Sequence, residues 1–386
     1  MSKQMQNFSS NILDSILKAN PQYFENILAN KDSFRVQIMY TKIDRDKNNQ
    51  PHFTDYFFNV NNQHYFYPAS TVKLPAALLA LQKLNNLHIK NLDKNSLMKI
   101  DTSNTKESIA TYIKQIFLVS DNNAFNHLYE FLGQEYIRSE LTKKGYADAE
   151  IKHRLDISLT EEQNRTTNAI DFFDSAGNVI YHQPANYSNA QFSKRKTFLG
   201  KGYFNNNDSL INEPFNFSKK NRIYLTDLHQ ILRSVIFDES VSEKQRFNVK
   251  KEDYEFLHKY MSMYSRESAY PAYDSAIYYD AYDKLLLFGS QKEIPPNYIR
   301  IFNKEGDAYG FLTDVAYIAD FKNNIEFFLS ATIYCNSDGI FNDDKYDYDS
   351  VGYPFMKNLG NVIYQYELKR VKKFQPDLSS FNILYK

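Results

Sequence analysis

Apolar positions near the start of the chain repeat at helical spacing. They run through residues 12–28, and Pro21 divides this stretch into two expected helices. The spacing then changes, because segments 34–40 and 52–58 are rich in the aromatic and β-branched residues that favour strands. A polar turn at 44–49 joins these segments. The pattern therefore predicts two helices followed by an antiparallel pair of strands.

Helical patterns dominate the middle of the chain. Leu74, Ala77, Leu78 and Leu81 form an apolar stripe that needs a core to cover it. Further helices are expected at 107–118, 123–132, 134–144, 226–237 and 251–264. Thr226 is the expected N-cap of the fourth of these helices.

Residues 157–221 separate two groups of expected helices. This stretch is rich in Asn, Ser and Lys, and it contains one clear hairpin. In the hairpin, segments 169–173 and 179–182 flank the turn-forming cluster 174–178. We expect the remainder to be an elaborated loop region.

The tail of the chain returns to strand patterns and ends in a helix. Strands are expected at 298–302, 314–319 and 325–333, followed by a helix at 351–369. Strands at both chain ends with helices between them predict an α+β fold, in which one antiparallel sheet is built from both ends and flanked by helices. We expect a sheet lobe from residues 1–66 and 270–386 and an inserted, mainly helical lobe from 67–269.

The charge balance argues against a nucleic-acid partner. The 386 residues include 46 Lys and Arg and 46 Asp and Glu, so the formal net charge is zero. A protein without a basic field has no general attraction for nucleic acid. The short basic cluster 194–196 is interpreted as a solvated loop. The 31 Tyr and 30 Phe favour an ordered globular chain.

The cysteine, the histidines and the apolar runs give no sign of a reactive thiol, a metal site or a membrane helix. Cys335 is the single cysteine and follows an apolar run, so it is interpreted as a buried strand residue. The eight histidines form no His-Glu-x-x-His pattern, so neither a metal nor a cofactor is expected. No run of about eighteen apolar residues predicts a membrane helix, and the first seven residues lack the apolar core of a signal peptide. We expect a small-molecule substrate and a monomer.

Ser70 and Lys73 lie one helical turn apart at an expected helix start. Positions i and i+3 share a helix face, so the Lys73 amine can reach the Ser70 hydroxyl. Such a lysine can take the serine proton when burial or a second cation disfavours its charge. Ser-x-x-Lys occurs five times in the chain. Only the Ser70 copy directly follows the expected strand pair.

Ser120-Asp121-Asn122 occurs once, fifty residues after Ser70. A second hydroxyl beside an amide suits a proton shuttle and an anchor for a substrate amide. The alternative is a helix N-cap, because Ser, Asp and Asn all cap helices well.

Lys304-Glu305-Gly306 ends the first expected strand of the tail. A lysine there could place a cation near Ser70, disfavouring the charge of Lys73 and attracting an anionic substrate group. Gly306 would let a substrate backbone approach the strand edge. The alternative is an ordinary turn.

Together and in this order, the three motifs resemble those of the class A β-lactamases and related penicillin-recognising serine enzymes. Residues 154–156 resemble the start of the family's omega loop, and 224–228 resemble a family helix start. The resemblance therefore spans most of the chain.

The resemblance implies a role for each motif residue. Ser70 would be the acylated nucleophile, with Lys73, or a carboxylate acting through water, as its base. Ser120 would relay a proton to the leaving nitrogen, and Asn122 would hold the substrate amide. Backbone N–H groups of Ser70 and Asp307 would form the oxyanion hole.

Two positions depart from the family pattern. Glu305 stands where the family usually has a hydroxyl residue, and a glutamate facing the site would repel a substrate carboxylate. Either the substrate lacks a carboxylate, or Glu305 turns outward. Leu159 stands where the omega-loop glutamate that drives deacylation is expected. Glu161 or Glu162 could serve instead, or both could be solvated loop charges. Without either, an acyl-enzyme would form and persist.

Three functions follow as hypotheses. The first is a β-lactamase-like serine hydrolase that acts through a Ser70 acyl-enzyme on an amide or ester, with β-lactams as first candidates. The second is a penicillin-binding, peptidase or esterase-type enzyme in which Glu305 favours neutral or cationic substrates. The third is a catalytically silent binding protein of the same fold. By resemblance to the family, we expect a bacterial protein that is periplasmic or otherwise exported.

Overall fold

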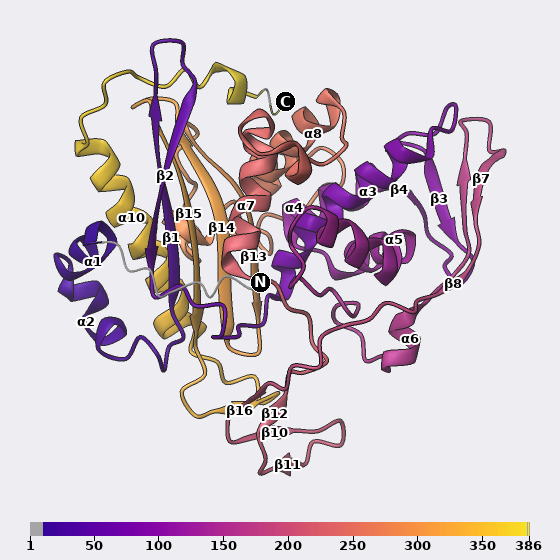
Figure 1. Cartoon of the computed structure of the whole chain (residues 1–386), viewed down its shortest axis with the longest axis horizontal. Helices are drawn as coiled ribbons and strands as arrows, with labels where there is room; N and C mark the ends of the chain where they lie inside the picture. Colours follow the sequence, from indigo (N-terminus) through magenta and orange to yellow (C-terminus); the bar gives the residue numbers. More distant parts are fainter. Residues whose placement is uncertain (1–10, 384, 386) are drawn as a thin grey trace.

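A five-stranded antiparallel sheet forms one half of the molecule (Figure 1). The computed structural model describes residues 11–383 and 385, so the expectation for the first seven residues lies outside it. The strands are β1 (Gln37–Arg45), β2 (Pro51–Phe58), β13 (Ile299–Ala308), β14 (Phe311–Asp320) and β15 (Ile325–Tyr334). Their order is β13-β14-β15-β1-β2. A single sheet thus combines strands from both chain ends, which confirms the predicted α+β fold class.

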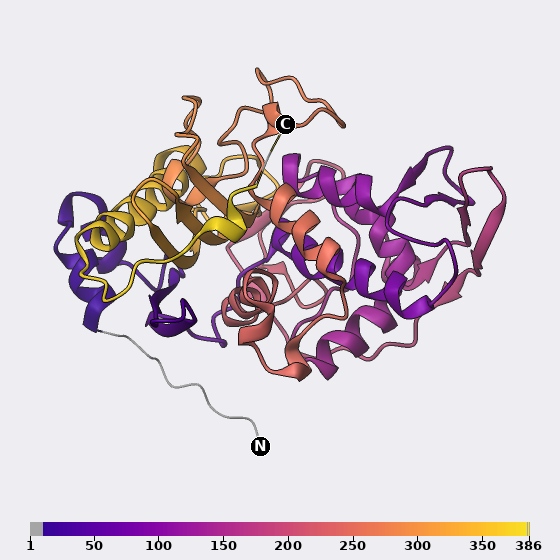
Figure 2. The same cartoon turned by 90° about the horizontal axis from the view of Figure 1, so that it is seen from above.

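The two faces of this sheet are covered by different helices. One face packs against α1 (Asn11–Lys18), α2 (Pro21–Ala29), α9 (Leu285–Phe288) and α10 (Tyr353–Lys369). Alternation along β1 explains the two cores, because Ile38 and Tyr40 face these helices whereas Met39 faces the opposite side. Figure 2 shows the sheet and its outer helices beside a second, mainly helical half.

The helical half lies between β2 and β13 in the sequence. Its main helices are α3 (Lys73–Leu87), α4 (Ile109–Val119), α5 (Asn122–Lys143), α7 (Leu225–Ile236) and α8 (Lys251–Ser262). They share one apolar core with the inner face of the sheet. Gly133 adopts φ 69° and ψ 155° inside α5, which explains why the sequence predicted two helices there.

The elaborated region is built from short strands. Two of these strands extend a sheet that begins earlier in the chain, with the order β4-β3-β6-β7: β3 (Leu97–Ile100) and β4 (Lys106–Ser108) precede the region, and β6 (Ile170–Phe173) and β7 (Val179–Gln183) lie within it. The last two strands are the predicted hairpin. The remaining short elements of the region are α6 (Glu161–Arg165), β5 (Thr166–Thr167), β8 (Asn186–Tyr187), β9 (Phe198–Leu199), β10 (Gly202–Phe204), β11 (Leu210–Ile211) and β12 (Phe215–Asn216). A strand from the tail of the chain, β16 (Ile340–Phe341), pairs with β10.

Several local predictions differ from the structure. The helix expected to start after Thr226 begins at Leu225 with Tyr224 as its N-cap, so Thr226 caps nothing. β13 continues to Ala308, so the third motif lies within a strand and not in a turn. Cys335 is buried immediately after β15. Within the described part of the chain, no helix is both long and apolar enough to cross a membrane.

Candidate active site

Ser70 lies in a tight turn between the sheet and α3. Residues Ala69–Val72 form a short 3-10 helix that leads directly into α3. The turn is fixed by Thr71, whose backbone N–H and side-chain hydroxyl both donate to the Pro68 carbonyl, at 3.0 and 2.6 Å. Ala69 adopts φ 44°, a left-handed conformation that costs energy for a residue with a side chain. The strained turn holds the half-buried Ser70 at the start of the helix.

Lys73 is fully buried beneath Ser70. Its exposed fraction is 0%, and its amine lies 2.8 Å from Ser70 Oγ and 2.7 Å from Asn122 Oδ1. The amine also donates to the Ser120 carbonyl. Burial, reinforced by the charge of Lys304, lowers the pKa of Lys73 to about 7. Near neutral pH a large fraction of Lys73 is therefore uncharged and able to accept the Ser70 proton.

Ser120 and Asn122 reach the site from the junction of α4 and α5. Ser120 ends α4 with φ 56°, and Asp121 caps α5 by accepting a 2.7 Å hydrogen bond from the Ala124 N–H. Of the three residues 120–122, Asp121 is therefore the one that caps α5. Ser120 and Asn122 remain available to contact Lys73.

Lys304 approaches the same hydroxyl from β13. It is 1% exposed, and its amine donates to Ser120 Oγ at 2.9 Å. Ser120 Oγ also lies 3.4 Å from the Lys73 amine, so one hydroxyl links the two lysines. The structure thus brings together Ser70, Lys73, Ser120, Asn122 and Lys304 from three separate parts of the chain.

Glu305 is buried and forms an ion pair with Lys304. Burial acts to raise the pKa of Glu305, but the adjacent Lys304 charge outweighs this effect and holds the pKa below its usual value. The carboxylate is therefore ionised and neutralises the neighbouring lysine. Glu305 does not turn out into solvent, since only 4% of it is exposed.

Gly306 allows β13 to close directly onto the nucleophile turn. A Cβ atom at this position would lie 2.7 Å from the Ser70 nitrogen and 2.8 Å from both the Pro68 oxygen and the Thr71 nitrogen. The space spared by the glycine is thus filled by the protein's own backbone, whereas we expected it to admit a substrate. Asp307 follows on β13 and is exposed. Its N–H as part of an oxyanion hole stays a prediction.

A second layer of buried charge lies behind Lys304, and sequence reasoning missed it. Lys284 is 2% exposed and donates to Asn303 Oδ1 at 2.8 Å, while Asn303 donates to Asp314 Oδ1 at 2.9 Å. Burial lowers the pKa of Lys284 to about 8 and raises that of Asp314 to about 6. Burial and the charge of Glu305 raise the pKa of the adjacent Asp283. Asp283 and Lys284 precede the short apolar run 285–288, and nothing in this pattern indicates that the two charged residues are buried.

The carboxylates of the expected omega loop are engaged elsewhere. Glu161 has a side chain that is 48% exposed, and it pairs with Lys219 at 3.0 Å and with Arg165 at 3.5 Å. Glu162 accepts a 2.6 Å hydrogen bond from the Tyr187 hydroxyl. Among the described residues, neither carboxylate hydrogen-bonds to Ser70, Lys73 or Ser120. The structure does not bring this pair to the candidate nucleophile.

The described part of the chain contains no candidate metal site. No group of three or more His, Cys, Asp or Glu side chains is arranged there to hold a metal ion.

This chain resembles known proteins both in part of its sequence and in its fold. Residues 21–180 match the model of a β-lactamase enzyme family. No curated protein matches the sequence. Among solved structures, similar folds include β-lactamases from Sphaerobacter thermophilus (TM-score 0.50, 10% identity) and Xanthomonas campestris pv. campestris (TM-score 0.51, 12% identity). These alignments cover 91% and 90% of this chain and 95% and 98% of the respective structures.

A penicillin-binding protein has a similar fold. PBP-A, solved as a point mutant in an acyl-enzyme complex with penicillin G, aligns with a TM-score of 0.50 and 12% identity. The alignment covers 92% of this chain and 96% of that protein. At such low identities the likeness establishes the fold alone. Residues 21–180 thus resemble a β-lactamase enzyme family, and the chain as a whole shares the fold of the solved β-lactamases and of PBP-A.

Proposed function

We propose that this chain is a β-lactamase-like serine hydrolase that forms an acyl-enzyme at Ser70, with amides or esters as substrates and β-lactams as first candidates. The observation that carries the proposal is the 2.8 Å contact between Ser70 Oγ and the buried Lys73 amine. The pKa of about 7 for Lys73 supports its use as a base under physiological conditions.

In the proposed acylation, uncharged Lys73 accepts the Ser70 proton while Ser70 Oγ bonds to the substrate carbonyl carbon. Backbone N–H groups of Ser70 and Asp307 would stabilise the oxygen of the tetrahedral intermediate. The C–N or C–O bond then breaks, and the leaving group receives a proton from Lys73 through the Ser120 hydroxyl. The 2.9 Å contact with Lys304 supports this route, because a cation there favours movement of a proton away from Ser120. Asn122 would orient the substrate amide.

Deacylation is proposed to be slow for β-lactams. It requires a base that activates water beside the acyl-enzyme, and Glu161 and Glu162 were the candidates for this role. Both carboxylates have partners on the protein surface. This supports the second candidate, a penicillin-binding role in which the adduct at Ser70 persists.

The charge of the site supports a substrate without a carboxylate. Lys304 would attract an anionic group, but its ion pair with buried Glu305 removes that attraction. This observation favours a peptidase or esterase acting on neutral or cationic substrates as the natural activity.

One experiment separates these activities. The protein and a Ser70→Ala variant are incubated with a chromogenic cephalosporin and a fluorescent penicillin while intact mass is recorded. Turnover would support β-lactam hydrolysis, and a lasting adduct that requires Ser70 would support penicillin binding. Ester and peptide panels test the third activity. An absence of turnover and adduct with every substrate class would contradict a serine hydrolase and favour a silent binding protein.

Location and assembly are further parts of the proposal. The family match supports an exported, periplasmic protein, and cell fractionation tests this. The zero net charge supports the absence of a nucleic-acid partner. A monomeric state is a further part of the proposal. Light scattering after gel filtration, with and without added DNA, measures both properties.

A further inference from the structure

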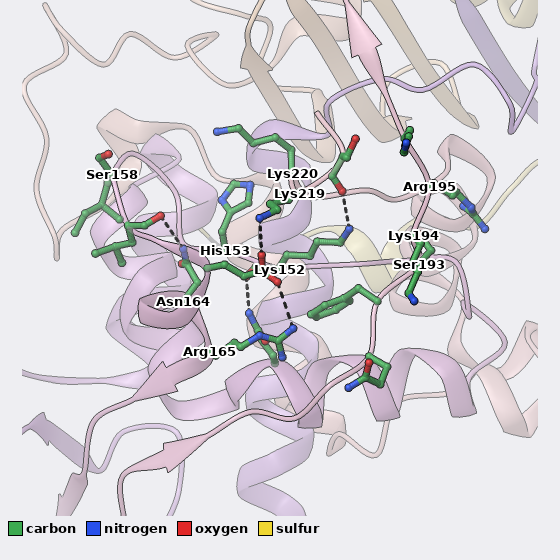
Figure 3. Close-up of a pocket in the computed structure, with 18 residues that line it drawn as sticks. Lys152, His153, Ser158, Asn164, Arg165, Ser193, Lys194, Arg195, Lys219 and Lys220 are labelled. Carbon is green, nitrogen blue, oxygen red and sulfur yellow. Dashed lines mark hydrogen bonds and ion pairs between the residues drawn. The ribbon is translucent and has the colours of Figure 1, made fainter. Parts of the chain in front are cut away.

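A basic cavity lies within the elaborated region, beside the loop that contains α6 (Figure 3). Its volume is about 520 Å³, which falls in the usual range for small-molecule sites. Three segments supply most of the lining: residues 157–165, 191–196 and 218–220. None of Ser70, Lys73, Ser120 or Lys304 lines it. The cavity is therefore a feature separate from the candidate active site.

Positive side chains dominate the lining. Seven lysines and arginines line the cavity, whereas Glu161 is the one carboxylate among the lining residues. The cations are Lys152, Arg165, Lys194, Arg195, Lys196, Lys219 and Lys220. The whole chain has zero net charge, so this concentration departs from its average composition.

Carboxylates neutralise only part of this charge. Lys152 pairs with Glu150 at 2.7 Å, Arg195 pairs with Asp148, and Glu161 is shared between Lys219 and Arg165. Seven cations thus face three carboxylates. Lys194 and Lys196 have no carboxylate partner within 4.0 Å among the described residues, and Lys220 donates to the Tyr309 hydroxyl at 3.0 Å.

Part of the basic wall is held in place by the fold. The Lys152 side chain is 10% exposed, and its amine also donates to the Ser218 carbonyl at 3.1 Å. Arg165 donates to the carbonyls of Ser188 and Ala190 at 3.0 and 3.1 Å. Both cations lie over the Phe192 ring, at 5.4 and 5.9 Å from its centre. Fixed cations of this kind bind an anion with little loss of side-chain entropy.

We propose that this cavity binds a small polyanion with two or more phosphate or carboxylate groups. The residues 194–196, interpreted from sequence as a solvated loop, form one wall of the site together with Lys152, Arg165 and 219–220. Repulsion among the excess cations is relieved when an anion binds, and each contact is a charge-assisted hydrogen bond. The proposal does not depend on the activity of Ser70.

Calorimetric titration of the full chain tests the proposal. Pyrophosphate and tripolyphosphate represent phosphate ligands, citrate represents carboxylate ligands, and monophosphate measures the benefit of multiple charges. At about 50 mM salt, we expect pyrophosphate or citrate to bind at least about fivefold more tightly than monophosphate. The tighter of the two identifies which anion chemistry the site prefers.

A matched pair of double variants locates the binding. Lys194→Ala/Lys196→Ala removes two exposed lysines of the cavity, and Lys47→Ala/Lys90→Ala removes two exposed lysines elsewhere. The first variant should weaken binding about tenfold, and the second should change it less than about twofold. Thermal unfolding checks that both variants remain folded. Equal weakening by the two variants, or no binding of any of the four anions at about 1 mM, would overturn the proposal.

Discussion

The surroundings of Ser70 and the loop at 154–165 use charge in opposite ways. Around Ser70, two lysines are almost fully buried and converge on the Ser120 hydroxyl. In the loop, Glu161 and Glu162 lie at the surface and bind neighbouring surface groups. The groups that could transfer an acyl group to Ser70 are thus gathered in one place. The carboxylates that could remove the acyl group are not among them.

This difference matters because burial changes the chemistry of a charged group. Burial lowers the pKa of Lys73 to about 7, which makes an ordinary ammonium into a usable base. At the surface, the hydrogen bond from Lys219 lowers the pKa of Glu161 and makes it a weaker base. We therefore propose that the site favours acylation of Ser70 over hydrolysis of the acyl-enzyme.

Removal of the proposed base should have the largest effect. Lys73→Ala is expected to slow adduct formation with a fluorescent penicillin by about 10²- to 10⁴-fold, because the proton of Ser70 loses its acceptor. Intact mass recorded over time measures this rate. Lys90→Ala, an exposed lysine shortly after α3, serves as the control and should react at the native rate. Native reactivity of Lys73→Ala would show that another group activates Ser70.

Displacement of the nucleophile turn should have the next largest effect. In Gly306→Ala, the added Cβ would lie 2.7 Å from the Ser70 nitrogen, so the backbone must shift. We expect acylation to slow by about 10- to 100-fold, since small misplacements of reacting groups are costly.

The control for this variant is Gly177→Ala, where a Cβ meets no atom within 4 Å but the backbone has φ 86°. It should lose some stability and keep its acylation rate. Thermal unfolding beside the acylation assay separates the two effects. A native acylation rate in folded Gly306→Ala would contradict the described packing.

Release of Lys304 from its ion pair should increase acylation. Glu305→Thr frees the lysine to attract the carboxylate of a penicillin, and we expect acylation about tenfold faster. Glu305→Gln keeps the size of the side chain and removes its charge, so it should produce a similar increase. If both variants react with penicillin at the native rate, the charge of Glu305 does not govern substrate choice.

Changes in the loop should have the smallest effect. Glu161→Gln and Glu162→Gln are each expected to alter the lifetime of the penicillin adduct by less than about twofold, because a general base must lie within hydrogen-bond reach of the reacting water and both carboxylates are held by surface partners. Mass spectra recorded after removal of free penicillin measure the decay. A marked lengthening in either variant would identify that glutamate as a deacylation base that approaches Ser70 during the reaction.

Local patterns predicted the elements of the fold and the order of the three motifs. The helices, the hairpin and the strands from both chain ends follow from spacing and turn residues, which act over a few positions. The identity of the α5 cap was less predictable, because Ser120, Asp121 and Asn122 can all cap a helix. The structure assigns the cap to Asp121, whereas the Ser120 hydroxyl contacts the distant Lys73 and Lys304.

Features that depend on long-range packing could not be predicted. The ion pair of Glu305 with Lys304 needs burial by other elements, and the close approach of Gly306 to Ser70 joins positions that are 236 residues apart. Residues 194–196 form an exposed loop, as the sequence predicted. That they line one cavity together with Lys152 and 219–220 could not be predicted, because it depends on long-range packing.

The pH dependence of acylation tests the central claim most directly. If uncharged Lys73 accepts the Ser70 proton, the acylation rate should rise about tenfold per pH unit below pH 7 and level off above it, because the pKa of Lys73 is about 7. Intact mass or fluorescence recorded from pH 5 to pH 9 yields this profile. A rate that is flat over this range, or that still rises tenfold per unit at pH 9, would contradict a lysine base with a lowered pKa.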